Sequence, residues 1–377
     1  NEFMEMKNLK LIPLVFATLT LAACDSNKDN DEVKPEEAFA SASKAAKKTS
    51  ESDHAQIKTK EDGTLFGQGG VEIKNEDSTW NYFDLKISQL PIDFRYSGYS
   101  NKDASSLNAS LLSQGDENSA GATIKLNTDY DIGSASTFVP TSISDLSFAT
   151  YLEQGTLYVD SSDSDLALYR VAISSLISSL TGNTYSLPQK GKISLSEDGL
   201  TSFNNLINDI NVDISSLEKL YADVPSVFGF KNNEIKIETN DKNEFKSYLK
   251  AVYNRVEEEM ADEEKSSAAS IEEEFFNHYD VYLDNSTFNK FSTSIYFDEN
   301  GLTGVKSSLS ISDFDHDGIV ASLPEEQVIL HGNLSYSADF AFAYDESVLP
   351  LSPLDKDKYQ EIEIPDIDIN GEITASN

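Results

Sequence analysis

The chain has 377 residues, of which 65 are acidic and 29 are basic, so its formal net charge at pH 7 is −36. Such a charge repels phosphate groups, which excludes nucleic acid as an electrostatic partner. Cys24 is the single cysteine, which excludes an internal disulfide and a thiolate metal cluster. The apolar share of 39% is sufficient for a buried core, and we expect the chain to fold.

The amino-terminal segment has the composition of a secretory signal. Lys7 and Lys10 precede an apolar run at residues 11–21, which is followed by two alanines and then Cys24. The run is shorter than the roughly 20 residues that span a bilayer. We therefore expect residues 1–23 to be a signal peptide that is removed.

Leu21-Ala22-Ala23-Cys24 resembles the lipobox of bacterial lipoproteins. The resemblance implies cleavage before Cys24 and attachment of diacylglycerol to its sulfur. The chain would then lie at the extracytoplasmic face of the cell membrane, with the membrane as its partner through the lipid anchor. Residues 24–35 are almost entirely polar after Cys24, which predicts a flexible tether to a domain at residues 36–377. The alternative is an ordinary signal peptide with a fortuitous cysteine.

Alternating apolar and polar residues predict half-buried antiparallel strands at residues 83–87, 124–132 and 334–344. Residues 295–311 contain Asn300-Gly301 between two such runs, which predicts a hairpin. Residues 362–369 alternate isoleucine with acidic residues, and Pro365 favours an edge position.

Helical periodicity appears near the amino-terminal end of the domain and in its middle. Residues 36–49 are rich in alanine, and residues 166–180 place apolar side chains on one face before Gly182. A further helix is predicted at residues 200–207. The clearest begins after Asp241 with Glu244 three residues later, and leads into an acidic stretch at residues 257–275 that we expect to be solvated.

Together these elements predict an α+β fold with a large antiparallel sheet. The order of lipobox, tether, Ala/Lys helix and long strands with crossing helices resembles the LolA-like and LppX-like lipoproteins. Gly155-Thr156-Leu157-Tyr158-Val159-Asp160 and Phe297-Asp298-Glu299-Asn300-Gly301-Leu302 resemble strand-and-turn segments of such lipoproteins from low-GC Gram-positive bacteria. The resemblance implies a large curved antiparallel sheet, an open half-barrel, packed on several helices. It also implies a carrier or binding role for an apolar ligand, and it supplies no catalytic residues.

One segment resembles the first half of a calcium loop. Asp313, Asp315 and Asp317 alternate before Gly318, but Pro324 stands where such loops place a bidentate glutamate. Two interpretations stay open, a structural calcium site and an acidic Asp-Gly hairpin turn. No other cofactor is expected.

Trp80, Tyr82 and Phe83 are the aromatic cluster proposed as the wall of a ligand cavity, with an ordinary core strand as the alternative. The four histidines show no zinc-binding spacing, and no Gly-x-Ser-x-Gly motif is present, so we do not expect an enzyme. Gly67-Gln68-Gly69-Gly70 lacks the lysine of a phosphate loop and is interpreted as a bulge or turn.

Two functions follow from these observations. The first is a non-enzymatic, membrane-anchored lipoprotein that binds or carries a lipid or another apolar molecule. The alternative is a structural or interaction protein of the cell envelope with no ligand cavity. An extracellular hydrolase would require a cluster of serine or aspartate with His278 or His331.

Overall fold

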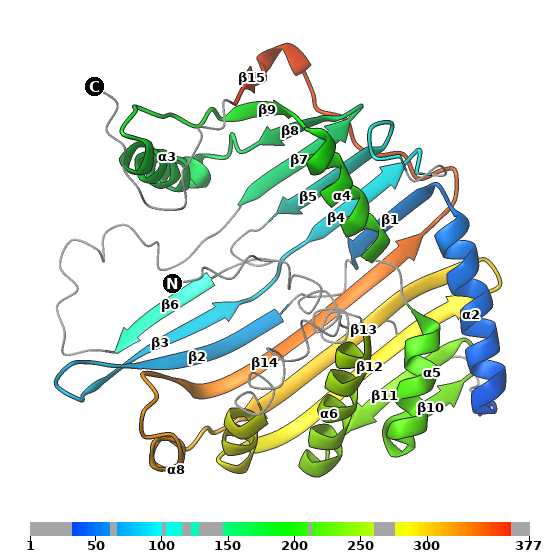
Figure 1. Ribbon diagram of the computed structural model, residues 1–377, viewed down its shortest axis with the longest axis vertical. Coiled ribbons are helices and arrows are strands. Elements are labelled where there is room, and N and C mark those ends of the chain that lie inside the picture. The colour runs from blue at the N-terminus through cyan, green and yellow to red at the C-terminus, as the bar shows by residue number, and fades with distance from the viewer. Residues whose placement is uncertain are drawn as a thin grey trace.

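The computed structural model describes residues 32–60, 66–99, 103–114, 122–127, 146–209, 213–259 and 276–362. The strands of this part form one 15-stranded sheet (Figure 1). The predicted α+β fold, with a large curved antiparallel sheet packed on several helices, is confirmed. Cys24 and the predicted signal peptide lie outside the described residues, as do residues 260–275 and 363–377.

Twelve strands follow one another across the sheet, each hydrogen-bonded to the next. In spatial order they are β10 (Phe228–Lys231), β11 (Glu234–Thr239), β12 (Thr287–Asp298), β13 (Gly301–Ser312), β14 (Val328–Ala343), β1 (His54–Thr59), β4 (Ile92–Ser97), β5 (Asn108–Gln114), β7 (Ser147–Glu153), β8 (Thr156–Asp160), β9 (Lys190–Ser194) and β15 (Gln360–Glu361). The β9–β15 pair is parallel, and the other strand pairs of the described part are antiparallel.

The remaining strands branch from β14. The first half of β14 pairs with β2 (Phe66–Lys74), which continues to β3 (Trp80–Ile87) and β6 (Ala122–Asn127). Its second half pairs with β1. The 16-residue β14 therefore carries two different neighbours along one edge.

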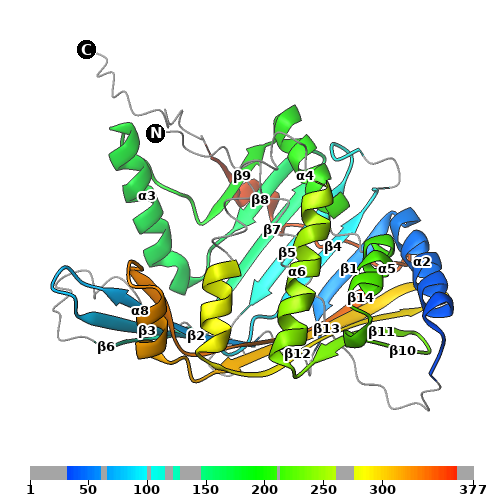
Figure 2. The same cartoon turned by 60° about the horizontal axis from the view of Figure 1, so that its bottom comes forward.

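The helices lie along one side of the bent sheet, which we call the concave face (Figure 2). They are α2 (Pro35–Glu51), α3 (Ala167–Thr181), α4 (Glu197–Asp209), α5 (Ile214–Asp223), α6 (Lys242–Glu259) and α8 (His316–Ser322), and residues 276–284 are also helical. Short 3₁₀ turns lie at η3 (Ser164–Leu166), η4 (Pro225–Val227) and η5 (Lys356–Lys358). No helix of the described part combines the length and apolar character needed to cross a membrane.

The α2 helix confirms the predicted alanine-rich helix. Pro35 begins it, Glu36 and Glu37 lie in its first turn and Lys48 lies in its last, all positions that suit the helix dipole. Ala42 and Ala45 are fully buried, and their small side chains let the helix approach the sheet closely.

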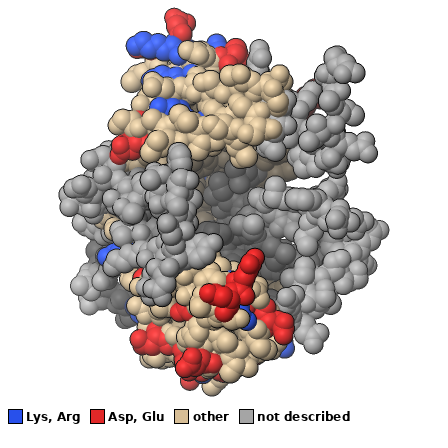
Figure 3. Space-filling view, turned by 90° about the vertical axis from the view of Figure 1, so that its left-hand side faces the viewer, with Lys and Arg blue, Asp and Glu red and all other residues tan. Residues whose placement is uncertain are grey.

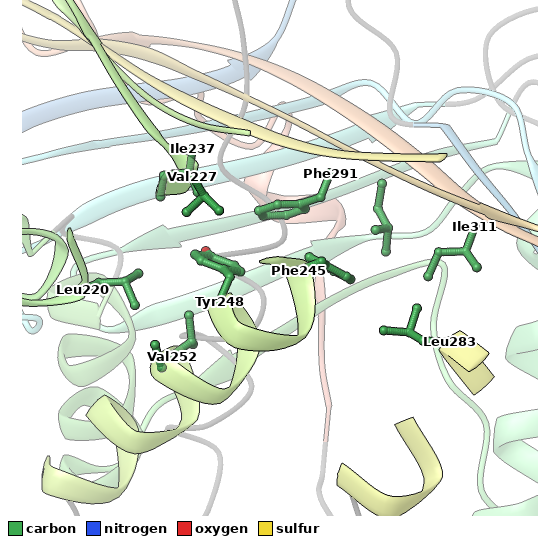
Figure 4. Close-up of a cluster of buried hydrophobic side chains, with 11 residues drawn as sticks. Leu220, Val227, Ile237, Phe245, Tyr248, Val252, Leu283, Phe291 and Ile311 are labelled. Atoms are coloured by element: carbon green, nitrogen blue, oxygen red, sulfur yellow. The ribbon is translucent and has the colours of Figure 1, made fainter. Parts of the chain in front are cut away.

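The α6 helix covers the largest apolar cluster (Figure 4). Phe245, Tyr248 and Val252 project from it onto the sheet, where Phe291 of β12 lies 5.0 Å from both the Phe245 and Tyr248 rings, measured between centroids. Asp241 Oδ1 accepts the backbone N–H groups of Asn243 and Glu244, which confirms the predicted cap.

The β12–β13 hairpin is confirmed, with its turn one residue earlier than the Asn-Gly pair suggests. Asp298 pairs with Gly301, so the two-residue loop is Glu299-Asn300. The Asp298 carboxylate accepts the N–H groups of Asn300 and Gly301, and this side-chain turn shifts the register.

Residues 345–359 return along the opposite, convex face of the β4–β9 strands, before residues 360–361 join the edge of the sheet as β15. The Leu351 N–H donates to Ser110 Oγ at 2.9 Å, and the Tyr359 ring meets Tyr158 edge-on at 5.2 Å. This half of the sheet is therefore covered by α4 on one face and by the returning chain on the other.

Candidate functional site

Trp80, Tyr82 and Phe83 all lie on β3 but do not share a face, because successive side chains alternate. Trp80 meets His316 of α8 edge-on at 5.3 Å, and Tyr82 stacks on His331 of β14 at 4.8 Å. Phe83 points to the other face. The structure thus brings two of the three predicted residues together, against histidines.

Those histidines share one carboxylate. His331 Nδ1 lies 2.6 Å from Glu72 Oε1, and His316 Nδ1 contacts Glu72 Oε2. The Glu72 side chain on β2 is only 11% exposed, and Asp84 Oδ1 lies 3.9 Å from His331 Nε2. We call Glu72, His316 and His331 the Glu72 cluster. It ties α8, β2 and β14 together by polar contacts.

The glycine-rich segment at residues 67–70 makes this arrangement possible. It lies inside β2, so the prediction of a turn between strands is wrong, and the irregularity opposite it has its extra residues on β14, between His331 and Ser335. A Cβ atom on Gly70 would lie 2.7 Å from Asp84 Oδ1 and 3.0 Å from the His331 carbonyl oxygen. Glycine is therefore required for the strands to bring His331 beside Glu72.

The calcium-like segment does not form a loop. Asp313 adopts a left-handed conformation with φ 57°, Asp315 precedes α8, and Asp317 lies in its first turn. The alternative hairpin turn is also wrong, because a helix begins at His316. Among the described residues no group of three or more His, Cys, Asp or Glu side chains is placed to hold a metal ion. The structure thus does not bring the three carboxylates together as a metal site.

The other two histidines lie apart from the Glu72 cluster. His54 Nδ1 contacts Asp53 at 2.6 Å, and His278 Nε2 contacts Glu326 at 2.7 Å. Each contacts a carboxylate outside that cluster.

An apolar row crosses the concave face at the other half of the sheet. The strand registers place Phe342, Ile57, Phe94, Leu111 and Val159 on one face, with Thr150 between the last two. We call these five residues the apolar belt. Every one of them is only half-buried, and Phe340, Ile92 and Phe148, two residues further along their strands, continue the surface and are half-buried too.

The neighbouring row on the same face is buried. Ala55, Tyr96, Ala109 and Leu152 are at most 7% exposed, and Ile207 of α4 packs on them. Burial raises the pKa of the Tyr96 hydroxyl to about 12, with a further contribution from Tyr99. The row that contains Ala55 and Tyr96 is thus buried beneath α4, whereas the apolar belt beside it is only half-buried, although both rows are apolar.

Ionisable groups of the same strands point away from the belt. On β4, Asp93 and Arg95 flank Phe94 and form an ion pair at 2.7 Å on the convex face. Burial of the Asp93 carboxyl favours its neutral form, but hydrogen bonds from Arg95 and Gln56 outweigh this effect, so the pKa of Asp93 lies below its ordinary value. The belt itself contains no charged group and no catalytic pair, so its chemistry suits apolar contact alone.

The belt and the Glu72 cluster are separate sites. Phe342 and His331 are eleven positions apart on β14, which corresponds to roughly 35 Å along an extended strand. Trp80 and Tyr82 therefore do not line the belt. The period-two pattern of residues 92–96 and 109–111 is the sequence signal for the belt, but it is too short to show that the strands lie side by side.

Comparison with known proteins identifies no relative. No protein-family model matches the chain, and no curated protein or solved structure is significantly similar to it.

Proposed function

We propose that this protein is a non-enzymatic lipoprotein, anchored at the extracytoplasmic face of the membrane, that binds an apolar ligand such as a lipid acyl chain. The observation that carries the proposal is the apolar belt. Its five residues form an uncharged row on the concave face, interrupted by Thr150, and stay half-buried beside a row that is buried.

Burial of apolar surface explains how the belt would hold a ligand. Each square ångström of apolar surface removed from water contributes about 25 cal/mol, and ligand sites are usually concave and mostly apolar. A flexible acyl chain lying across β14, β1, β4, β5, β7 and β8 would cover the exposed parts of Phe342, Phe94 and Leu111. The absence of charged groups from the belt favours the tail of such a ligand over its headgroup.

Leu111 and Leu112 provide a matched test of this ligand site. They are adjacent on β5 and both are half-buried, but alternation places Leu111 in the belt and Leu112 on the convex face. Native mass spectrometry of the full chain, released from membranes in mild detergent, would reveal a bound apolar molecule. Collisional activation removes such a ligand and leaves a covalent lipid in place.

We expect the wild type and Leu112→Gln to carry the ligand and Leu111→Gln to lose it. Equal retention by the two variants would show that the belt is not the site. A wild type that carries nothing, even after incubation with membrane lipids, would favour the alternative of an interaction protein of the cell envelope.

The anchor is a separate part of the proposal and rests on Leu21-Ala22-Ala23-Cys24. Cells grown with radiolabelled palmitate should label the wild type, while Cys24→Ser should stay unlabelled and leave the membrane fraction. Equal labelling of both proteins would overturn the assignment of Cys24.

A further inference from the structure

The α3 helix exposes apolar side chains on more than one side. The exposed fractions are 57% for Leu168, 37% for Tyr169, 63% for Val171, 47% for Ile173 and 59% for Leu176. The sequence predicts an amphipathic helix here, and Gly182 ends it as expected with φ 70°. The apolar residues nevertheless remain largely uncovered, which is uncommon for a soluble surface.

Charge is almost absent from α3. The helix contains no acidic residue, although the chain contains 65, and Arg170 is its one charged side chain. Arg170 Nη1 turns back to donate to the carbonyl oxygens of Ser161 and Asp163. Figure 3 shows the upper block of the molecule, where α3 lies, as a mostly uncharged surface, with basic and acidic residues at its top and along one side, and with several acidic patches on the lower block.

Three of the four serines of α3 donate their hydroxyl groups to the backbone of the helix. Ser174, Ser178 and Ser179 donate to the carbonyl oxygens of Arg170, Ser174 and Ser175 at 2.6, 2.8 and 2.9 Å. Ser178 and Ser174 in addition accept the N–H groups of Tyr185 and Leu187 in the segment that follows. These hydroxyls need no water, as is found for serines of helices in lipid.

We propose that α3 docks into the surface of a lipid bilayer, at the boundary between headgroups and acyl chains. The exposed apolar side chains and the inward polar groups suit this medium, whereas a protein partner would commonly meet a polar, hydrogen-bonding rim. Fifteen residues extend about 22 Å, less than the roughly 30 Å of the hydrocarbon core, so α3 lies in the interface and does not span it.

The charge of the chain sets the lipid preference. With a net charge of −36 and an α3 surface without free lysines, electrostatic attraction to anionic headgroups does not contribute. Docking should therefore occur on zwitterionic phosphatidylcholine and depend little on salt. This inference does not rest on the apolar belt.

Tryptophan fluorescence tests the proposal site by site. Trp80 is the single tryptophan, so Trp80→Phe gives a background in which Leu176→Trp reports on α3 and Ser202→Trp reports on the exposed surface of α4. Each full chain is reconstituted with phosphatidylcholine vesicles that contain brominated acyl chains, which quench tryptophan only on contact. Val171→Trp serves as a second reporter if Leu176→Trp folds poorly.

We expect brominated lipid to lower the emission of the α3 reporters by about twofold and to leave Ser202→Trp unchanged. Equal emission of both reporters with brominated and ordinary lipid would overturn the proposal, as would failure of the chain to float with the vesicles. An unquenched α3 reporter in a chain that sediments as a dimer would assign this face to a second copy instead.

Discussion

At the scale of single residues, glycine decides how closely α8 approaches the chain before β12. A Cβ atom on Gly318 would lie 2.1 Å from Asn285 Oδ1 and 2.8 Å from Asp315 Oδ2. The Asn285 side chain donates to the Val281 carbonyl, and the backbone carbonyl of Asn285 accepts the Asp315 N–H. The glycine of the calcium-like segment therefore serves close packing and not a metal-binding turn.

Gly318→Ala should lower the free energy of unfolding by about 1–3 kcal/mol, because the added methyl group overpacks this contact. Gly199→Ala is the matched control within α4, where the nearest atom lies at 3.5 Å. That change should raise stability by about 0.5–1 kcal/mol through helix propensity. Urea unfolding monitored by circular dichroism measures both, and a shift of the same sign in the two variants would contradict the packing argument.

Glu72 is the second residue expected to affect stability strongly, because its carboxylate contacts the imidazoles of His316 and His331. Glu72→Ala removes the hydrogen-bond partner of His331 and the carboxylate that His316 contacts, and should cost about 1–3 kcal/mol. Glu76→Ala, at an exposed position of the following turn, should change stability by less than about 0.5 kcal/mol. Equal unfolding midpoints for the two variants would show that the Glu72 cluster does not hold α8 to the sheet.

At the scale of elements, the start of α6 shows how a cap is built. The sequence pattern suggests that Glu244 completes a box with Asp241, but Glu244 instead accepts the hydroxyl of Thr239 at 2.7 Å. The same hydroxyl oxygen accepts the Asp241 N–H at 2.9 Å. Thr239 thus supplies half of the cap and joins the end of β11 to the helix that covers it.

Asp241→Ala should lower the free energy of unfolding by about 1 kcal/mol, since two N–H groups lose their acceptor. Asp241→Asn keeps an acceptor oxygen at the same place and should retain most of the stability. Thermal unfolding distinguishes the two, and an alanine variant as stable as the wild type would place the cap elsewhere.

At the scale of the whole molecule, buried tyrosines determine the response to alkali. Burial raises the pKa of Tyr96 and of Tyr336 to about 12 from the ordinary 10.0, and it raises the pKa of Tyr248 and Tyr344 as well. Between these pH values the unfolded chain has lost protons that the folded chain keeps. Stability must therefore fall as the pH rises from about 10 toward 12.

Each tyrosine that stays protonated in the folded chain and ionises in the unfolded chain should lower the free energy of unfolding by about 1.4 kcal/mol per pH unit, which amounts to a few kcal/mol near pH 12. Tyr96→Phe keeps the ring contacts with Phe94 and Tyr99 and removes one titrating group, so its stability should decline less steeply. Urea midpoints measured at intervals from pH 8 to pH 12 test this. Parallel pH profiles for the two proteins would exclude Tyr96 as a contributor.

The sequence predicts individual helices and strands better than it predicts which of them lie side by side. Alternation identifies β3 and the second half of β14, and helical spacing identifies α3, α4 and α6. Gly182 at the end of α3 and Asp241 at the start of α6 are correct, whereas α4 begins earlier than predicted, at Glu197. The sequence pattern does not predict the α5 helix or the β10–β11 hairpin, because these elements are short. The segment at Asp313–Gly318 is misinterpreted because three alternating aspartates suit a metal loop as well as the start of a helix.

The apolar belt depends on strand pairing that the sequence pattern does not reveal. Phe342 and Ile57 face each other although 285 positions separate them, and Phe94 joins them only through the register of β1 with β4. Local patterns show which side of a strand is apolar. They do not show which strands lie together or where a covering helix ends, and these two facts define the apolar belt.

The position of β14 has a consequence for how the protein is made. This strand joins the β10–β13 half of the sheet to β1 and β2, yet among the described residues it is the last long strand to be synthesised. A nascent chain can form local hairpins as it emerges. The two parts of the sheet can be joined through β14 only after residue 343 is available. Native contacts of such high sequence separation form slowly. We expect the two edges that flank β14 to remain open throughout synthesis, so that the complete chain, and not its amino-terminal half, is the unit that folds.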